Sequence, residues 1–231
     1  MWRRGVRGRC LATLVFALLA GFDALAADIQ PSIETVRFRN YSTSNGLSQA
    51  TALAMAQDTT GFIWVGTQDG LDRFDGYGFK VYRHDRADPW SLADNAIYAL
   101  AADTDGVVWV GTQAGGLDRY DPLKDRFEHH QADPSKPDTL ASDLVTALMI
   151  DRRGWLWVAT TSGKLQWYDR ATQSLHDTPL GTRSELTDVR ALAEQADGLV
   201  LVGARDGLWR CDSNASKLQE IRFDPQRQLD V

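Results

Sequence analysis

The chain has 231 residues, 43% of them hydrophobic and 24% charged, which is the composition of a globular protein. Its formal net charge of −6 makes nucleic acid and anionic membrane surfaces poor partners. Beyond the N-terminal segment, no stretch is long and apolar enough to be a transmembrane helix.

Residues 1–26 have the features of a secretory signal peptide. Four arginines precede an apolar run at residues 10–22, and a small-x-small sequence ends at Ala26, so we expect cleavage there and a periplasmic location. The alternative, an uncleaved membrane anchor, needs a longer apolar run. Removal takes away four arginines and one aspartate, so the formal charge falls from −6 to −9. Cys211 is then the one cysteine left, which excludes an internal disulfide.

Residues 27–231 are built from repeats, and this decides how each motif is interpreted. The sequence DTTGFIWVGTQDGLDRFD is followed by three related copies. The four copies occupy residues 58–75, 103–121, 151–169 and 195–212. The same position in the copies holds Trp64, Trp109, Trp157 and Leu201, at spacings of 45, 48 and 44 residues.

Each repeat contains four short β segments. The first two are joined by Asp-x-x-Gly, which suits a tight turn, and the second is apolar on both sides, as in a strand covered on both faces. Four strands in a unit of this length are typical of a β-propeller blade. We therefore predict an all-β propeller whose four blades occupy about residues 49–84, 95–131, 143–177 and 187–224.

A further strand is predicted before the first blade. Residues 36–42 resemble the fourth strand of a blade, with Phe38 and Tyr41 matching Phe79 and Tyr82. The chain then has four blades and one orphan strand. Propellers have roughly four to eight blades, so we expect an incomplete ring here, with more blades following in a longer protein. Exposed blade faces would make such an arc prone to association.

Residues 45–79 resemble the two-component regulator propeller repeat almost residue for residue. The resemblance covers about residues 36–223. It implies a periplasmic sensor region, followed in the family by a small β-sandwich, a membrane helix and a cytoplasmic hybrid histidine kinase or diguanylate cyclase, and thus a role in signal transduction by phosphorelay or cyclic dinucleotide. The chain departs from the family by stopping before those parts, and in its fourth blade by Leu201 and Cys211.

Repetition gives most conspicuous residues a structural interpretation. The glycines Gly61, Gly106 and Gly154 close turns, and the tryptophans Trp64, Trp109 and Trp157 pack between blades. Residues 103–106 resemble part of a calcium loop, but the other copies lack the second carboxylate, so we expect no metal. No catalytic or cofactor-binding constellation stands out, so we expect no cofactor and no enzymatic activity in this chain.

Loop positions that differ between blades are the candidates for ligand binding. The loops between second and third strands gather with the connectors at one end of a propeller, and ligand residues lie on loops held by a rigid scaffold. The candidates are Gln68, Asp69, Trp90, Gln113, Thr161, Arg205 and Asp206, with Lys136 as a further connector residue.

We expect a sensor that binds an extracellular ligand, for example an oligosaccharide, or a protein, with a dimer as an option. Membrane association would come only through C-terminal segments outside this sequence. Two alternatives remain open, a secreted propeller enzyme (polysaccharide lyase, hydrolase or quinoprotein) and a passive envelope scaffold. Quinone absorbance or polysaccharide turnover would favour the first, and a ring that closes only with a partner chain would favour the second.

Overall fold

The computed structural model describes residues 38–178, 186, 188–212 and 217–222. The chain divides into two compact units, residues 1–40 and 41–231, and only residues 38–40 of the first are described. The predicted signal peptide lies outside the described residues. In the described part of the chain, no helix has the length and apolar character needed to cross a membrane.

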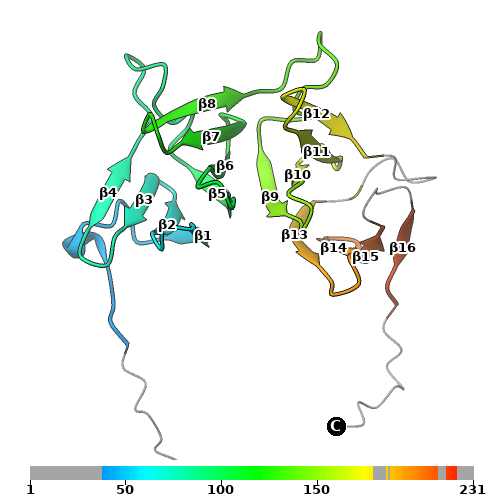
Figure 1. The fold of residues 1–231 in the computed structure, drawn as a ribbon, viewed down its shortest axis with the longest axis horizontal. Helices are drawn as coiled ribbons and strands as arrows, with labels where there is room; N and C mark the ends of the chain where they lie inside the picture. The colour runs from blue at the N-terminus through cyan, green and yellow to red at the C-terminus, as the bar shows by residue number, and fades with distance from the viewer. Residues whose placement is uncertain (1–37, 179–185, 187, 213–216, 223–231) are drawn as a thin grey trace, which may run out of the picture. The chain divides into compact units, whose positions relative to one another are not determined.

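The second unit consists of four antiparallel four-stranded sheets, which confirms the predicted all-β class with four blades (Figure 1). Strands within each sheet follow chain order, so every blade is a meander. The short 3-10 helix η1 (Thr43–Asn45) precedes the sheets. The first blade contains β1 (Ala52–Gln57), β2 (Ile63–Thr67), β3 (Gly70–Phe74) and β4 (Phe79–Tyr82). The second contains β5 (Ile97–Ala102), β6 (Val108–Thr112), β7 (Leu117–Asp121) and β8 (Arg126–His130).

The third and fourth blades repeat this plan. In all four blades the pairing of the first two strands shifts register near the start of the first strand, which bends that strand at one repeated place. The third blade contains β9 (Val145–Ile150), β10 (Leu156–Thr160), β11 (Leu165–Asp169) and β12 (Ser174–Asp177). The fourth contains β13 (Val189–Glu194), β14 (Val200–Ala204), β15 (Gly207–Cys211) and β16 (Leu218–Glu220).

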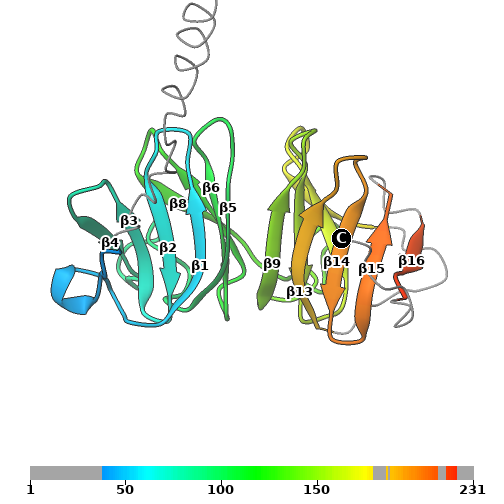
Figure 2. The ribbon, with the colours of Figure 1, turned by 90° about the horizontal axis from the view of Figure 1, so that it is seen from below.

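Within residues 41–231, the blades follow one another around an arc (Figure 1). β1 packs beside β5, β5 beside β9, and β9 beside β13, so the first strand of each blade lies on the inner side of the arc (Figure 2). The ring is not closed, as the sequence predicts. On the first blade, Leu53 and Met55 are 40% and 66% exposed, unlike the apolar side chains between blades.

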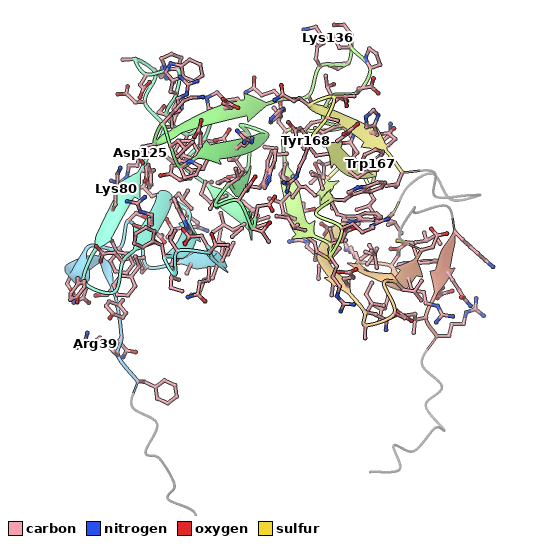
Figure 3. The ribbon with its side chains drawn as sticks, viewed as in Figure 1. Arg39, Lys80, Asp125, Lys136, Trp167 and Tyr168 are labelled. Atoms are coloured by element: carbon pink, nitrogen blue, oxygen red, sulfur yellow. The ribbon has the colours of Figure 1, made fainter. Side chains whose placement is uncertain are left out.

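Neighbouring blades share apolar cores, each built around one tryptophan. Trp64, Trp109 and Trp157 are at most 1% exposed and face the following blade. Polar side chains close the outer margin of the first interface, where Lys80 of β4 forms an ion pair with Asp125 of the β7–β8 turn (Figure 3). The first interface is therefore apolar inside and ionic at the rim.

Two glycines allow the inner strands of neighbouring blades to approach closely. A Cβ on Gly66 would lie 2.5 Å from Ile97 Cγ2, and a Cβ on Gly111 would lie 2.6 Å from Val145 Cγ1. Such contacts are shorter than van der Waals distance, so a larger residue requires the blades to shift.

The predicted orphan strand is wrong over its described part, because residues 38–42 adopt no strand. Each sheet already has its own fourth strand, so this segment finds no sheet in the described chain that lacks one. Tyr41 instead packs edge-on against Phe74 and Phe79, with ring centroids 4.8 and 5.7 Å away. Residues 36 and 37 lie outside the described residues.

Connectors are fixed where they enter the first three blades. A buried leucine is followed by a residue whose backbone N–H donates to a side chain of the third strand. The pairs are Ser48 with Asp72 (2.9 Å), Ala93 with Asp118 (2.8 Å) and Ala141 with Gln166 (2.9 Å). Because Asp118 is buried, its pKa is raised, and it is hydrogen-bonded to His129.

Candidate functional site

All seven predicted ligand residues lie on exposed loops. Six are in the loops between second and third strands, and Trp90 is in the connector between β4 and β5. The backbone N–H groups of Gln113, Thr161 and Arg205 donate to connector carbonyls at 2.9, 3.1 and 3.3 Å. Loops and connectors therefore meet at one end of the blades, which we call the loop end.

Trp90 covers the edge of the second blade. The guanidinium carbon of Arg126 lies 3.8 Å from the centroid of its ring, and the N–H of Phe127 donates to its carbonyl at 2.9 Å. The side chain is still 45% exposed. None of the seven predicted residues lines any of the three cavities described below, so they remain predictions.

Lys136 borders a cavity of about 420 Å³ at the loop end of the third blade (Figure 3). The connector of residues 132–141 forms one wall, with Lys164 and Asp177 opposite. Both lysines are already paired, Lys136 with Asp133 at 3.1 Å and Lys164 with Asp177 at 2.6 Å. A ligand here would have to displace these ion pairs.

The opposite end, which we call the turn end, carries the repeated Asp-x-x-Gly turns. In the first blade, Oδ1 of Asp58 accepts the N–H groups of Thr60 and Phe62 at 2.9 and 3.1 Å. Oδ2 accepts the indole N–H of Trp64 at 2.7 Å. Burial opposes ionisation of Asp58, but these hydrogen bonds outweigh it and hold the pKa below its usual 3.8. The aspartate therefore joins the turn to the inter-blade core.

The third blade makes the same link, and the fourth lacks it. Asp151 accepts the indole N–H of Trp157 at 3.1 Å, and again hydrogen bonds overcome burial to lower its pKa. In the fourth blade, Gln195 stands in place of the aspartate that accepts the bond, and Leu201 stands in place of the tryptophan that donates it.

The second blade has both residues but not the bond. Among the described residues, the buried Nε1 of Trp109 has no hydrogen-bond partner. Asp103 accepts from the N–H of Thr104 at 2.6 Å and forms an ion pair with Arg170 of the third blade. This is the one turn of the three in which the aspartate reaches a neighbouring blade rather than its own tryptophan.

The third blade carries an aromatic cluster that the other blades lack. In the first blade, the guanidinium carbon of Arg73 lies 4.7 Å from the centroid of Phe62. The corresponding residues of the third blade are Trp167 and Trp155, whose rings stack at 4.3 Å and 14°. The remaining blades have Arg119 and Arg210 at the position of Trp167.

The side chains of Arg153 and His176 extend this stack into a ladder. The guanidinium carbon of Arg153 lies 4.3 Å from the centroid of Trp155, and the ring of His176 lies 4.8 Å from that of Trp167. We call these four residues the tryptophan ladder. Trp167 and the next residue, Tyr168, extend to opposite faces of β11 (Figure 3).

An open cleft of about 500 Å³ borders the ladder at the turn end. This volume is within the roughly 300–1,000 Å³ typical of small-molecule sites. Its walls combine aromatic surface with side chains of both charges, which suits a polar ligand with apolar faces. The lining includes Thr104, Arg153, Trp155, Trp167, Tyr168, Asp169 and Arg170.

The sequence predictions missed this cleft because they concentrated on the loop end. The available signal was the replacement of a repeated arginine by Trp167, together with a second extra tryptophan, Trp155, in the same copy. A difference between copies at a strand position carries as much information as a difference in a loop. Among the described residues, no three His, Cys, Asp or Glu side chains are grouped to hold a metal ion.

The fold and the repeats define a β-propeller module, and the comparisons show which known proteins it is similar to. Residues 91–114 and 139–162 match the model of the two-component regulator propeller family. Two of the four repeats of the chain thus match the two-component regulator propeller repeat. It is 37% identical over 79 residues to Histidine kinase P4 of Formosa agariphila, an alignment that covers 34% of this chain and 6% of that protein.

Solved structures share the architecture. One, from B. thetaiotaomicron, is named as the extracellular domain of a hybrid two component system; its TM-score is 0.69 at 25% identity, with 80% of this chain and 26% of that chain covered. Virginiamycin B lyase from Staphylococcus aureus has a TM-score of 0.54 at 13% identity, with 74% and 55% covered, and shows the fold alone. The chain spans only a small part of the histidine kinase and about a quarter of the extracellular domain.

Proposed function

We propose that this chain is the ligand-sensing propeller of a two-component signalling protein, exported to the periplasm by residues 1–26. The observation that carries the proposal is the match of its repeats to the two-component regulator propeller, together with the fold of a two-component extracellular domain at 25% identity. Both named two-component relatives favour a histidine kinase as the output of the longer protein over a cyclase. The propeller itself would bind and not catalyse.

The cleft beside the tryptophan ladder is the site we assign to the sensed ligand. It is open, it contains the stacked pair Trp155 and Trp167, and it lies between the turns of two blades. A ligand there would contact both blades and change how they pack, which is how a binding event becomes a change of conformation. An oligosaccharide is the first class to test, because its rings offer both apolar faces and hydroxyl groups.

A thermal-shift screen of the full chain against oligosaccharides tests the site. We expect a stabilising ligand whose shift disappears in Trp167→Arg, which restores the arginine of the other blades. Trp90→Ala, at the loop end, is the matched control and should leave the shift intact. Loss of the shift in Trp90→Ala alone would move the site to the loop end and contradict this assignment.

Export is tested separately with alkaline phosphatase fused to the end of the full chain. Activity that depends on residues 1–26 supports periplasmic placement, and equal activity without them contradicts it. Turnover of polysaccharide by the purified chain would instead support the enzyme alternative.

A further inference from the structure

Among the residues that the structure describes, the indole N–H of Trp109 has no hydrogen-bond partner. In the blades on either side, the equivalent atoms of Trp64 and Trp157 donate to an aspartate of their own turn. Trp109 is 1% exposed, so its N–H cannot be satisfied by bulk water. A buried donor without an acceptor is costly, and native proteins usually provide one.

One residue of the second turn, Asp105, accounts for the missing hydrogen bond between Asp103 and Trp109. Asp105 stands where the first blade has Thr60, and its Oδ1 accepts the N–H of Val107 at 3.1 Å. In the first blade the equivalent N–H, of Phe62, is bound by Asp58. Asp105 therefore takes over a role of the repeated aspartate. Asp103 forms an ion pair with Arg170, and both Oδ2 of Asp103 and Nε1 of Trp109 are without a hydrogen-bond partner among the described residues.

A cavity of about 210 Å³ lies at this place, between the second and third blades. It is smaller than the roughly 300–1,000 Å³ of sites for drug-sized ligands, so it suits a molecule of few atoms. Its walls carry two carboxylates and two guanidinium groups, with a buried indole between them. The lining includes Asp103, Asp105, Trp109, Arg119, Tyr168 and Arg170.

The two positive groups are only partly engaged with protein acceptors. Arg119 bonds Glu128 at 3.3 Å through one nitrogen, and a guanidinium has five N–H donors. Arg170 spans Asp103 and Asp105, the latter at 3.6 Å. The formal charges of these four lining residues cancel, but they are separated in space, so the cavity is dipolar.

We propose that this cavity binds a free α-amino acid as its zwitterion. The ligand carboxylate would accept from the indole N–H of Trp109 and from Arg119, and its ammonium group would donate to Asp105. A simple carboxylate would offer no donor to Asp105, and a simple amine would offer no acceptor to Trp109 and Arg119. Only a ligand with both charges pairs with both sets of groups.

This site goes beyond the proposed function, since amino-acid binding does not require signalling. It shares Asp103, Tyr168 and Arg170 with the cleft beside the tryptophan ladder, but neither Trp155 nor Trp167 lines it. Its failure would leave the sensor proposal intact, because the oligosaccharide shift is tested through Trp167. Failure of the oligosaccharide test would likewise leave amino-acid binding to be measured directly.

Isothermal titration calorimetry on the full chain tests the proposal, with glycine, L-alanine and L-serine as first probes and the remaining common amino acids after them. Acetate and ethylamine are the single-charge controls, and we expect either to bind at least about tenfold more weakly than the best amino acid. Trp109→Phe keeps the ring but removes the N–H, and it should weaken binding by a similar factor.

Trp64→Phe is the matched control, because the same change is made where the N–H already has a partner, and amino-acid binding should be unchanged. Should that variant fold poorly, Trp90→Ala at the exposed connector replaces it. No heat with any common amino acid at millimolar concentration would overturn the proposal. Equal loss in Trp109→Phe and the control, or acetate binding as tightly as the amino acid, would also overturn it.

Discussion

The indole nitrogen of Trp64 lies 2.7 Å from Oδ2 of Asp58, and this hydrogen bond joins a surface turn to the core between two blades. The turn fixes the carboxylate through two backbone N–H groups, and the carboxylate then fixes the ring. The ring orientation determines the surface that the next blade meets, where Tyr120 packs 4.8 Å from it. One short sequence unit thus specifies both a turn and an interface.

Replacing Trp64 by phenylalanine should lower the free energy of unfolding more than the same change at Trp109. Both changes remove similar apolar surface, but only the first breaks a hydrogen bond to a charged group, worth about 1.5–3 kcal/mol. Urea unfolding of the two variants measures the difference. Equal destabilisation would show that the bond from Trp64 to Asp58 contributes nothing net.

The change Asp105→Thr should rebuild the turn of the first blade in the second. Without the Asp105 carboxylate, the N–H of Val107 is free to donate to Asp103, which would rotate Asp103 toward Trp109. The indole N–H resonance of Trp109 should move and its hydrogen exchange should slow, as measured by NMR. The double change with Arg170→Gln should strengthen the effect, since Arg170 competes for the same carboxylate. An unmoved resonance in the double variant would contradict this account of the turn.

Acid should destabilise the protein through the aspartates of the first and third turns. Their pKa values lie below the usual 3.8 because hydrogen bonds to the ionised form outweigh burial. A carboxyl group whose pKa is lower in the folded state stabilises the fold at pH values above its pKa in the unfolded chain. This contribution is lost as the pH falls below 3.8 toward the pKa of the folded state. The double variant Asp58→Asn, Asp151→Asn should therefore lose less stability than the native chain over that range in urea titrations. If the free energy of unfolding falls equally with pH in the two proteins, these aspartates are excluded as a source of the pH dependence.

The repeat made the fold predictable from the sequence. Four copies with Trp64 or its equivalent at one position gave the number of blades, the four strands in each and the open ring. The orphan strand failed because matching Phe38 and Tyr41 to strand residues does not supply a sheet edge for them to join. Local pattern indicates a strand, but pairing requires a partner.

The sites were harder to predict, because they depend on exceptions to the repeat. The repeat predicts Asp58 as a turn residue and Trp64 as a packing residue, but it does not predict the bond between them. Asp105 stands out in the sequence only as part of an incomplete calcium loop. The contact of Arg170 with Asp103 joins residues of different blades, and no spacing within one repeat predicts it.

Close approach between blades gives a last test, since the second strand carries Gly66, Gly111 and Gly203 at one position. Gly111→Ala places a Cβ 2.6 Å from Val145, so the blades must shift, and we expect a loss of about 1–3 kcal/mol. Gly203→Ala is the matched control, because the nearest atom to its Cβ would be 3.4 Å away. It should be nearly neutral or slightly stabilising.

Ala159, fully buried at this position in the third blade, does not argue against the expected loss. That interface is built around a methyl group, whereas the interface at Gly111 has Val145 in the space that the methyl would need. Thermal unfolding of the two alanine variants decides the matter. Equal midpoints would mean that neighbouring blades slide past each other freely, and blade contacts could not then transmit a binding event from one blade to the next.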